Sequence, residues 1–152
     1  MSELRDLYQE VILDHGKSPR NHRVAEDANR LANGHNPLCG DKVRIYARTA
    51  DDGTIEDVAF QGAGCAISQA STSMMTQILK GKGEAEARDL IGRFVRLITD
   101  RDEPTDDEIE ALGKLAVFAG VREYPNRAKC ATLGWHTVSA ALDRADDPVS
   151  TE

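Results

Sequence analysis

The chain has 152 residues, 40% of them hydrophobic, and a formal net charge of -7 at pH 7. This size suits one domain, which we expect over residues 1–145, followed by a flexible acidic tail at 146–152. Acidic and basic side chains are interleaved, which argues against nucleic acid or an anionic membrane as a partner. We find neither an apolar leader nor the run of about 20 apolar residues that a membrane span needs, so we expect a soluble cytoplasmic protein.

The first part of the chain predicts a helix followed by a long loop. Apolar residues recur at helical spacing over residues 2–15, with Ser2 as the N-cap and Gly16 as the C′ residue. A polar segment that contains a proline follows and is expected to be mostly loop. A short strand is predicted at 28–33.

Two segments separated by a turn then predict a β-hairpin. Apolar and polar residues alternate over 43–48, the turn residues Asp51, Asp52 and Gly53 follow, and strand composition resumes over 55–61. Such alternation is typical of a hairpin that buries one face.

The second half of the chain predicts helices at four places. Their periodic segments are residues 66–80, residues 84–98, a segment from Thr105 to Gly120, and a last helix capped by Asn126. Thr105 and Glu108 have the spacing of a capping box. Because strands come early and helices late, we predict an α+β fold in which helices pack on one face of a small antiparallel sheet, with Trp135 in the core.

Three cysteines occur at predicted element boundaries: Cys39, Cys65 and Cys130. An odd number of cysteines without a leader predicts reduced thiols rather than a disulfide framework. All three are expected at the surface rim. Cys65 follows the second hairpin strand just before a helix and Cys130 is expected in the first turn of the last helix, where free N–H groups and the helix dipole favour a thiolate.

Asp41 follows Cys39 after one glycine. Gly40 would allow a sharp bend that turns both side chains toward one point, and three thiolates with one carboxylate would make a tetrahedral zinc site. The alternative is that the cysteines act as small buried hydrophobes, since no pair has the CxxC spacing of local zinc motifs. Spacing alone leaves both interpretations open.

Four segments together carry a family resemblance that spans nearly the whole chain. The chain resembles the NifU-like, IscU-like proteins of iron-sulfur cluster assembly, and most closely their SufU branch, which implies a SufE/NifU-like fold. The matching segments are residues 8–21, which end Asp14-His15-Gly16-Lys17-Ser18-Pro19-Arg20-Asn21, the turn Asn36-Pro37-Leu38-Cys39-Gly40-Asp41, the helix start Gly62-Ala63-Gly64-Cys65, and residues 127–135.

Departures from the scaffold-type IscU branch favour a sulfur acceptor. That branch carries a histidine immediately before its third cysteine, where this chain has Lys129. Its proline-rich chaperone-docking motif is also missing, because residues 124–127 read Tyr-Pro-Asn-Arg. The extra length between Cys65 and Cys130 is similar to SufU-type proteins.

The resemblance implies a zinc-dependent sulfurtransferase. The ligand set of SufU-like proteins falls on Cys39, Asp41, Cys65 and Cys130, and the partner is a pyridoxal-phosphate cysteine desulfurase of the SufS type. The family scheme implies that Cys39 leaves the zinc when a histidine of the partner replaces it, and then takes the terminal persulfide sulfur. Downstream Suf assembly proteins would receive that sulfur.

Two alternatives remain beside sulfur transfer: an iron-sulfur cluster scaffold that uses the same residues, and a purely structural zinc site. Arg127 could steer the anionic persulfide or pair with Asp41, or it could be a solvated cation at a helix start. We assign none of the four histidines to the metal.

Overall fold

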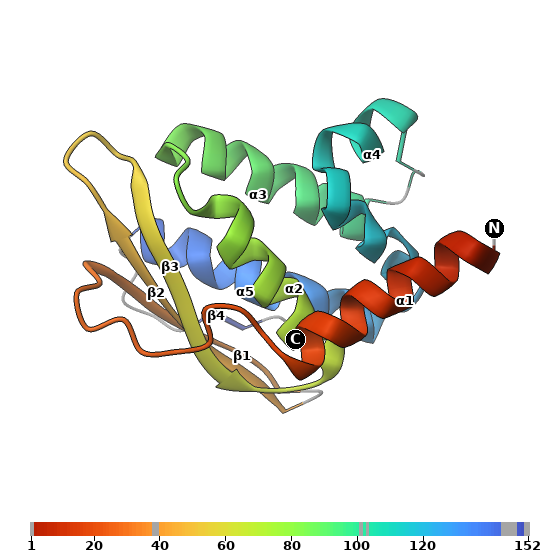
Figure 1. Ribbon diagram of the computed structural model, residues 1–152, viewed down its shortest axis with the longest axis horizontal. Helices are drawn as coiled ribbons and strands as arrows, with labels where there is room; N and C mark the ends of the chain where they lie inside the picture. The colour runs from red at the N-terminus through yellow and green to blue at the C-terminus, as the bar shows by residue number, and fades with distance from the viewer. Residues whose placement is uncertain (1, 38–39, 101, 103, 144–148, 151–152) are drawn as a thin grey trace.

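A computed structural model describes residues 2–37, 40–100, 102, 104–143 and 149–150 (Figure 1). Its elements, in chain order, are α1 (Ser2–Lys17), β1 (Arg30–Asn36), β2 (Asp41–Thr49), β3 (Ile55–Ala63), α2 (Ala66–Leu79), α3 (Glu84–Thr99), α4 (Asp106–Leu112), the 3-10 helix η1 (Gly113–Glu123), α5 (Pro125–Leu142) and β4 (Val149–Ser150). The predicted α+β class is confirmed. None of the helices in these ranges has both the length and the apolar content to cross a membrane.

The strands form one sheet in the order β3-β2-β1-β4. The first three strands are antiparallel neighbours, as the predicted hairpin requires, although β1 begins and ends later than the strand predicted at 28–33. β4 pairs in parallel with β1, Val149 opposite Gly34 and Ser150 opposite His35. Residues 149–150 of the predicted tail are therefore paired with the sheet, whereas 146–148 and 151–152 lie outside the described residues.

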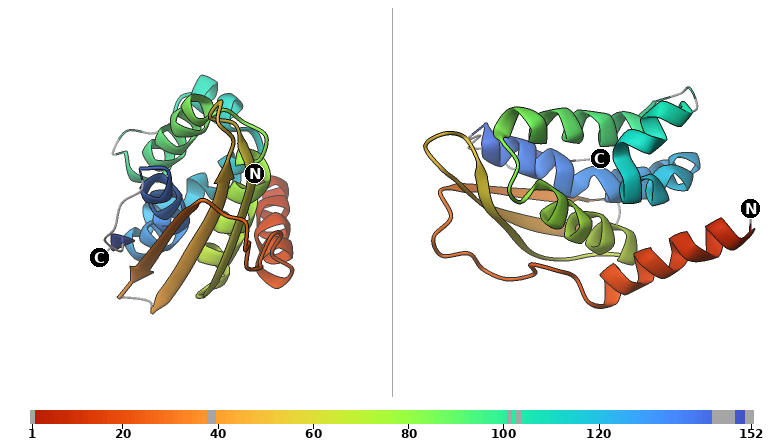
Figure 2. Two further views of the ribbon diagram at one scale, coloured as in Figure 1. Left: turned by 90° about the vertical axis from the view of Figure 1, so that its left-hand side faces the viewer. Right: turned by 45° about the horizontal axis from the view of Figure 1, so that its top comes forward.

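Helices α2 and α5 pack against one face of the sheet, and α3 packs against α5 (Figures 1 and 2). Buried and exposed residues alternate along β2 because every second side chain points toward the helices, except at Tyr46, which is buried in a separate cluster with Ala25 and Ala59. Gly34 lets β1 approach α5 closely, since a Cβ there would lie 2.1 Å from Thr137 Oγ1. The main core therefore lies between the sheet and the helices, and the smaller buried cluster around Tyr46 is separate from it.

Trp135 lies at the centre of this core, as predicted, with 0% of its surface exposed. Its ring stacks on Phe94 with 4.2 Å between the centroids. Its Nε1 donates to Ser71 Oγ at 2.9 Å, and the Ser71 hydroxyl donates to the Ala131 carbonyl at 2.5 Å. These contacts tie α2, α3 and α5 together around one side chain.

The predicted helix from Thr105 to Gly120 was wrong in its extent. Thr105 Oγ1 accepts from the Glu108 N–H at 3.2 Å, so the predicted cap is present. The α-helix stops at Leu112, however, and the chain continues as the 3-10 helix η1. Gly113 has a φ of +56°, a left-handed conformation that interrupts the helix and that side-chain-bearing residues rarely adopt.

Two other helix ends also differ from the prediction. α5 begins at Pro125 with Tyr124 as its N-cap residue, so Asn126 lies inside the helix rather than capping it. Proline suits the first helical position because its missing N–H would have no partner there anyway. α1 continues through Gly16 to Lys17, and a Cβ at Gly16 would meet the Ala66 Cβ at 3.3 Å, so this glycine serves close packing against the start of α2.

Candidate metal centre

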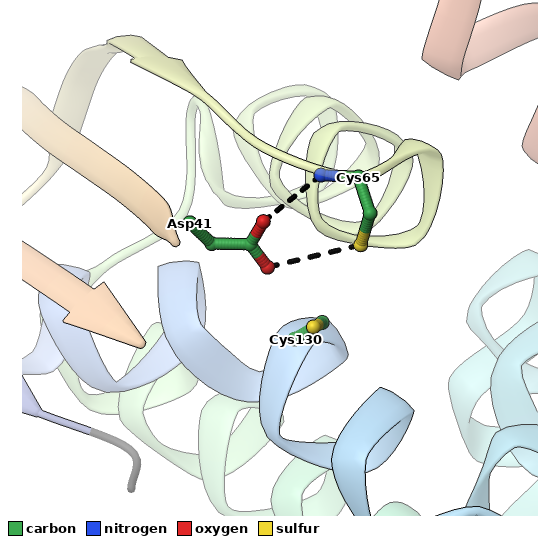
Figure 3. Close-up of side chains that lie close together, drawn as sticks. All are labelled: Asp41, Cys65 and Cys130. Carbon is green, nitrogen blue, oxygen red and sulfur yellow. Dashed lines mark hydrogen bonds between the residues drawn. The ribbon is translucent and has the colours of Figure 1, made fainter. Parts of the chain in front are cut away.

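Three predicted ligands converge where β2 begins and where α2 and α5 approach it. Asp41 is the first residue of β2, Cys65 immediately precedes α2, and Cys130 lies on α5 (Figure 3). One potential ligand atom of each residue lies within 4.8 Å of those of the other two. Residues far apart in the chain therefore form one group of two sulfurs and a carboxylate.

The Asp41 carboxylate is buried, with 1% of the residue exposed. Its Oδ1 accepts from the Cys65 backbone N–H at 2.9 Å, and its Oδ2 accepts from the Cys65 thiol at 3.7 Å. None of the ion pairs formed by the described residues involves Asp41. A buried carboxylate without a cationic partner is costly, and a bound cation would offset that cost.

Cys65 is the N-cap residue of α2. Its sulfur accepts from the Ser68 N–H at 3.5 Å, in the position that a serine or aspartate oxygen occupies in ordinary caps. Gly64 is required beside it, because a Cβ at this position would lie 2.4 Å from Asp41 Oδ1. The sulfur thus lies at the positive end of the helix dipole, which stabilises an anionic ligand.

Cys130 differs from its predicted surroundings. It lies in the second turn of α5, not the first, because the helix begins at Pro125. It is also buried, with 2% exposed, rather than at a surface rim. The side-chain amide of Asn36 donates to its sulfur, with 3.7 Å between Nδ2 and Sγ.

Sequence reasoning missed Asn36 as a functional residue. The available signal was that a polar residue follows Ala32 and Gly34 at the alternate positions of β1 that face the helices. Its partner, Cys130, lies 94 positions away in the chain, so local pattern could not identify the contact.

Cys39 lies outside the described residues, and its place in the site stays a prediction. The turn that contains it is closed by a hydrogen bond from the Gly40 N–H to the Asn36 carbonyl at 2.9 Å. Gly40 has a φ of +73°, the left-handed conformation that its predicted role in a sharp bend requires. Both described ends of this turn adjoin the group, since Asn36 contacts Cys130 and Asp41 belongs to it.

The predicted auxiliary residue Arg127 is exposed at the start of α5. Its guanidinium carbon lies 5.1 Å from the centroid of the Tyr124 ring, a cation–π contact. The ion pairs between described residues include none from Arg127 to Asp41. The group of Asp41, Cys65 and Cys130 includes no histidine of the described residues.

The donor set fits a zinc ion. Zinc binds thiolate sulfur and carboxylate oxygen and is almost always four-coordinate in structural sites, so the three described donors leave room for one more. A divalent cation would also neutralise negative charge that is otherwise buried with Asp41. The same sulfurs could ligate an iron-sulfur cluster, which cysteine thiolates also hold.

Comparison with known proteins gives one family and two kinds of relative. The family model of the NifU-like N terminal domain matches residues 7–131. The iron-sulfur cluster assembly scaffold protein IscU of Streptococcus pyogenes serotype M1 is 38% identical over 145 residues, covering 95% of this chain and 88% of that protein. The zinc-dependent sulfurtransferase SufU of Bacillus subtilis is also 38% identical over 145 residues, covering 95% of both chains.

Solved structures share the fold. A crystal structure titled as a putative iron-sulfur cluster assembly scaffold protein for the SUF system, from Fervidobacterium islandicum AW-1, has a TM-score of 0.79 and 36% sequence identity. The match covers 88% of this chain and 94% of that one. Some of these relatives are named as scaffold proteins and one as a sulfurtransferase, so the similarity does not distinguish between the two activities.

Proposed function

The chain belongs to the family of NifU-like N-terminal domains, and from that premise we propose that it is a zinc-dependent sulfurtransferase of iron-sulfur cluster assembly. The observation that carries the proposal is the group of Asp41, Cys65 and Cys130, whose ligand atoms lie within 4.8 Å of one another. The near full-length match to the zinc-dependent sulfurtransferase of Bacillus subtilis supports a place in the same family, and the departures from the scaffold branch at Lys129 and at residues 124–127 favour sulfur transfer within it.

In this proposal Cys39, Asp41, Cys65 and Cys130 hold the zinc. When bound, zinc would supply a redox-inert cation that keeps thiols deprotonated without reacting itself. Cys39 is the sulfur acceptor. Its thiolate attacks the terminal sulfur of a persulfide on a pyridoxal-phosphate cysteine desulfurase, a new sulfur–sulfur bond forms as the old one breaks, and the electron pair leaves on the desulfurase cysteine as its thiolate.

The surroundings of the other two cysteines support this choice of acceptor. Cys130 is 2% exposed, so a partner's persulfide cannot reach its sulfur without moving α5 or the sheet. Cys65 is exposed, but its sulfur is hydrogen-bonded to both Asp41 and the Ser68 N–H. Pro37 and Gly40, the described residues on either side of positions 38–39, are both exposed.

Arg127 would assist by attracting the anionic persulfide. It is exposed one turn before Cys130 and contacts the half-exposed Tyr124 at the start of α5. The sulfur would pass next to other Suf assembly proteins.

The test is alanine release from cysteine by a SufS-type desulfurase. Adding the protein should accelerate release, and Cys39→Ala should abolish the acceleration because no acceptor thiolate remains. Asn33→Ala, an exposed substitution on β1, is the matched control and should leave it intact. Native mass spectrometry of the purified chain should show one zinc ion, and wild-type protein that gives no acceleration would refute the proposal.

A cluster scaffold is the second candidate, favoured by the relatives of Streptococcus pyogenes and Thermotoga maritima, which are named as scaffold proteins. Anaerobic reconstitution with iron and sulfide distinguishes it. A stable, visible-absorbing cluster that passes intact to an acceptor apoprotein would favour the scaffold, whereas zinc-loaded protein that forms no such cluster would favour sulfur transfer.

A further inference from the structure

Asn36 occupies an unusual place for a polar side chain. It is the last residue of β1, it is 0% exposed, and it lies directly opposite Asp41 in the register of β1 and β2. Side chains of directly opposed residues project on the same face of a sheet. The Asn36 amide is therefore buried beside the Asp41 carboxylate, on the face that the helices cover.

Two hydrogen bonds of Asn36 link separate parts of the centre. Its side-chain Nδ2 donates to the Cys130 sulfur at 3.7 Å, which joins β1 to α5. Its backbone carbonyl accepts from the Gly40 N–H at 2.9 Å, which closes the turn that contains residues 38–39. One residue thus connects the turn of the predicted acceptor to the sulfur of another ligand.

The three described ligands differ in the source of their hydrogen bonds. The Cys65 sulfur accepts from the Ser68 N–H at the start of its own helix, and Asp41 accepts from the Cys65 N–H. Cys130 lies in the second turn of α5, beyond the helix start where N–H groups lack intrahelical partners. Its sulfur accepts a hydrogen bond from another element, the side chain of Asn36 on β1.

An amide is well suited to this position. Its N–H groups stabilise negative charge on sulfur, while the neutral group adds no cation that would compete with a metal for the same sulfur. Hydrogen bonds from outside the ligand set fix the orientation of a ligand and tune the metal that it binds.

We propose that Asn36 is a positioning residue of the metal centre, which acts through its hydrogen bond to Cys130 and keeps Cys130 bound as the stationary ligand. The inference rests on the proposed function only for the presence of a metal in this group. It goes beyond that function because Asn36, which is not a metal ligand, would help the protein to retain the metal.

The test compares zinc release from Asn36→Asp, Asn36→Ala and wild-type protein to an excess of a chromophoric chelator. Asn36→Asp has nearly the same shape and keeps the backbone carbonyl of the turn, but its carboxylate cannot donate to sulfur. Loss of a partner of this kind typically weakens metal affinity by about 10- to 100-fold, and we expect release to be faster by a comparable factor. Asn33→Asp, which adds the same charge at an exposed position of β1, should stay within about threefold of wild type.

A spectroscopic readout separates positioning from a merely structural role. In cobalt-substituted protein, losing the N–H donor raises the energy of the sulfur lone pair, so the sulfur-to-cobalt charge-transfer band should move to lower energy. A purely structural role would lower the melting temperature of the metal-free protein and leave that band unmoved. Release rates of both Asn36 variants within about threefold of wild type, an unmoved band, or failure of both variants to fold would each overturn the inference.

The outcome is distinguishable from failure of the proposed function. Wild-type protein that retains zinc but does not accelerate the desulfurase refutes sulfur transfer, and faster release from the Asn36 variants would still support the role of Asn36. Wild-type protein that retains no zinc in the chelator assay would overturn both.

Discussion

The carboxylate of Asp41 accepts a hydrogen bond from the backbone N–H of Cys65, with 2.9 Å between Oδ1 and N. This contact joins the start of β2 to the N-cap of α2. It also brings the two residues close enough for both to contact one ion, since their ligand atoms and that of Cys130 lie within 4.8 Å of one another. Gly64 permits the approach, because any side chain there would occupy the space of the carboxylate.

We predict that Gly64→Ala will lower the zinc content of the purified protein well below that of wild type. The added Cβ would lie 2.4 Å from Asp41 Oδ1, so the carboxylate or the start of α2 must move away from the metal position. Native mass spectrometry measures the zinc content. Gly120→Ala is the control, because a Cβ at Gly120 meets no atom within 4 Å, and full zinc occupancy in both variants would contradict the prediction.

The fold was largely predictable because its signals are local. Alternation located β2, since a buried sheet face imposes a period of two on a strand, and strand composition after a turn located β3. The predicted start of the last helix was wrong because two neighbouring residues both suit a helix start. Asn126 was expected to cap the helix, whereas α5 begins at Pro125. The break at Gly113 was missed because glycine inside a periodic segment is often tolerated within a helix.

The site was less predictable than the fold because its contacts are not local. Cysteine spacing could not show that Asp41, Cys65 and Cys130 meet, and only the family resemblance joined them. The burial of Cys130 and its hydrogen bond from Asn36 depend on how α5 packs against β1. Neither the cysteine motif nor the strand pattern contains that information.

We predict that Ser71→Ala will destabilise the protein by about 1–3 kcal/mol. Ser71 Oγ accepts from Trp135 Nε1, and its removal leaves a fully buried N–H without that partner. Urea denaturation followed by the fluorescence of Trp135, the single tryptophan, measures the change. Ser139→Ala on α5, which is only partly buried, should cost much less, and equal effects of the two substitutions would refute the assignment.

We predict that the metal-free protein will lose stability as the pH falls below about 6.5, the ordinary pKa of histidine. Burial, with a smaller contribution from Arg20, lowers the pKa of His15, whose Nδ1 lies 2.8 Å from Ser73 Oγ. Burial also lowers the pKa of His136. Below about pH 6.5 the unfolded chain therefore binds more protons at these two histidines than the folded protein does. The free energy of unfolding falls as the pH decreases from about 6.5 to the folded-state pKa values. At higher pH both histidines are neutral in both states and do not affect it.

Urea denaturation across this pH range, with a chelator present to exclude zinc release as the cause, measures the effect. His15→Gln and His136→Gln should each weaken the pH dependence of the free energy of unfolding, because each removes one group whose pKa differs between the folded and unfolded states. A slope unchanged in the double variant would assign the pH dependence to other groups.

We predict that removing zinc will lower the melting temperature of the wild-type protein. A ligand that binds only the folded state stabilises it by about 4 kcal/mol when its free concentration is about 1,000 times the dissociation constant. The ion would join three elements through Asp41, Cys65 and Cys130. Hydrogen exchange at the Cys65 backbone amide, which donates to Asp41 Oδ1, should therefore become faster when zinc is removed. A chelator should change neither quantity in Cys130→Ala if that variant no longer holds the metal.

Asp41→Ala separates a zinc ion that serves transfer from one that is purely structural. The substitution removes one ligand and the acceptor of the Cys65 N–H, so both interpretations predict a lower melting temperature. Sulfur transfer predicts in addition that acceleration of the desulfurase falls, because a disturbed centre no longer presents Cys39 correctly. Normal acceleration by a destabilised Asp41→Ala protein would make the zinc structural, whereas a lower melting temperature together with lost acceleration would support a zinc ion that serves transfer.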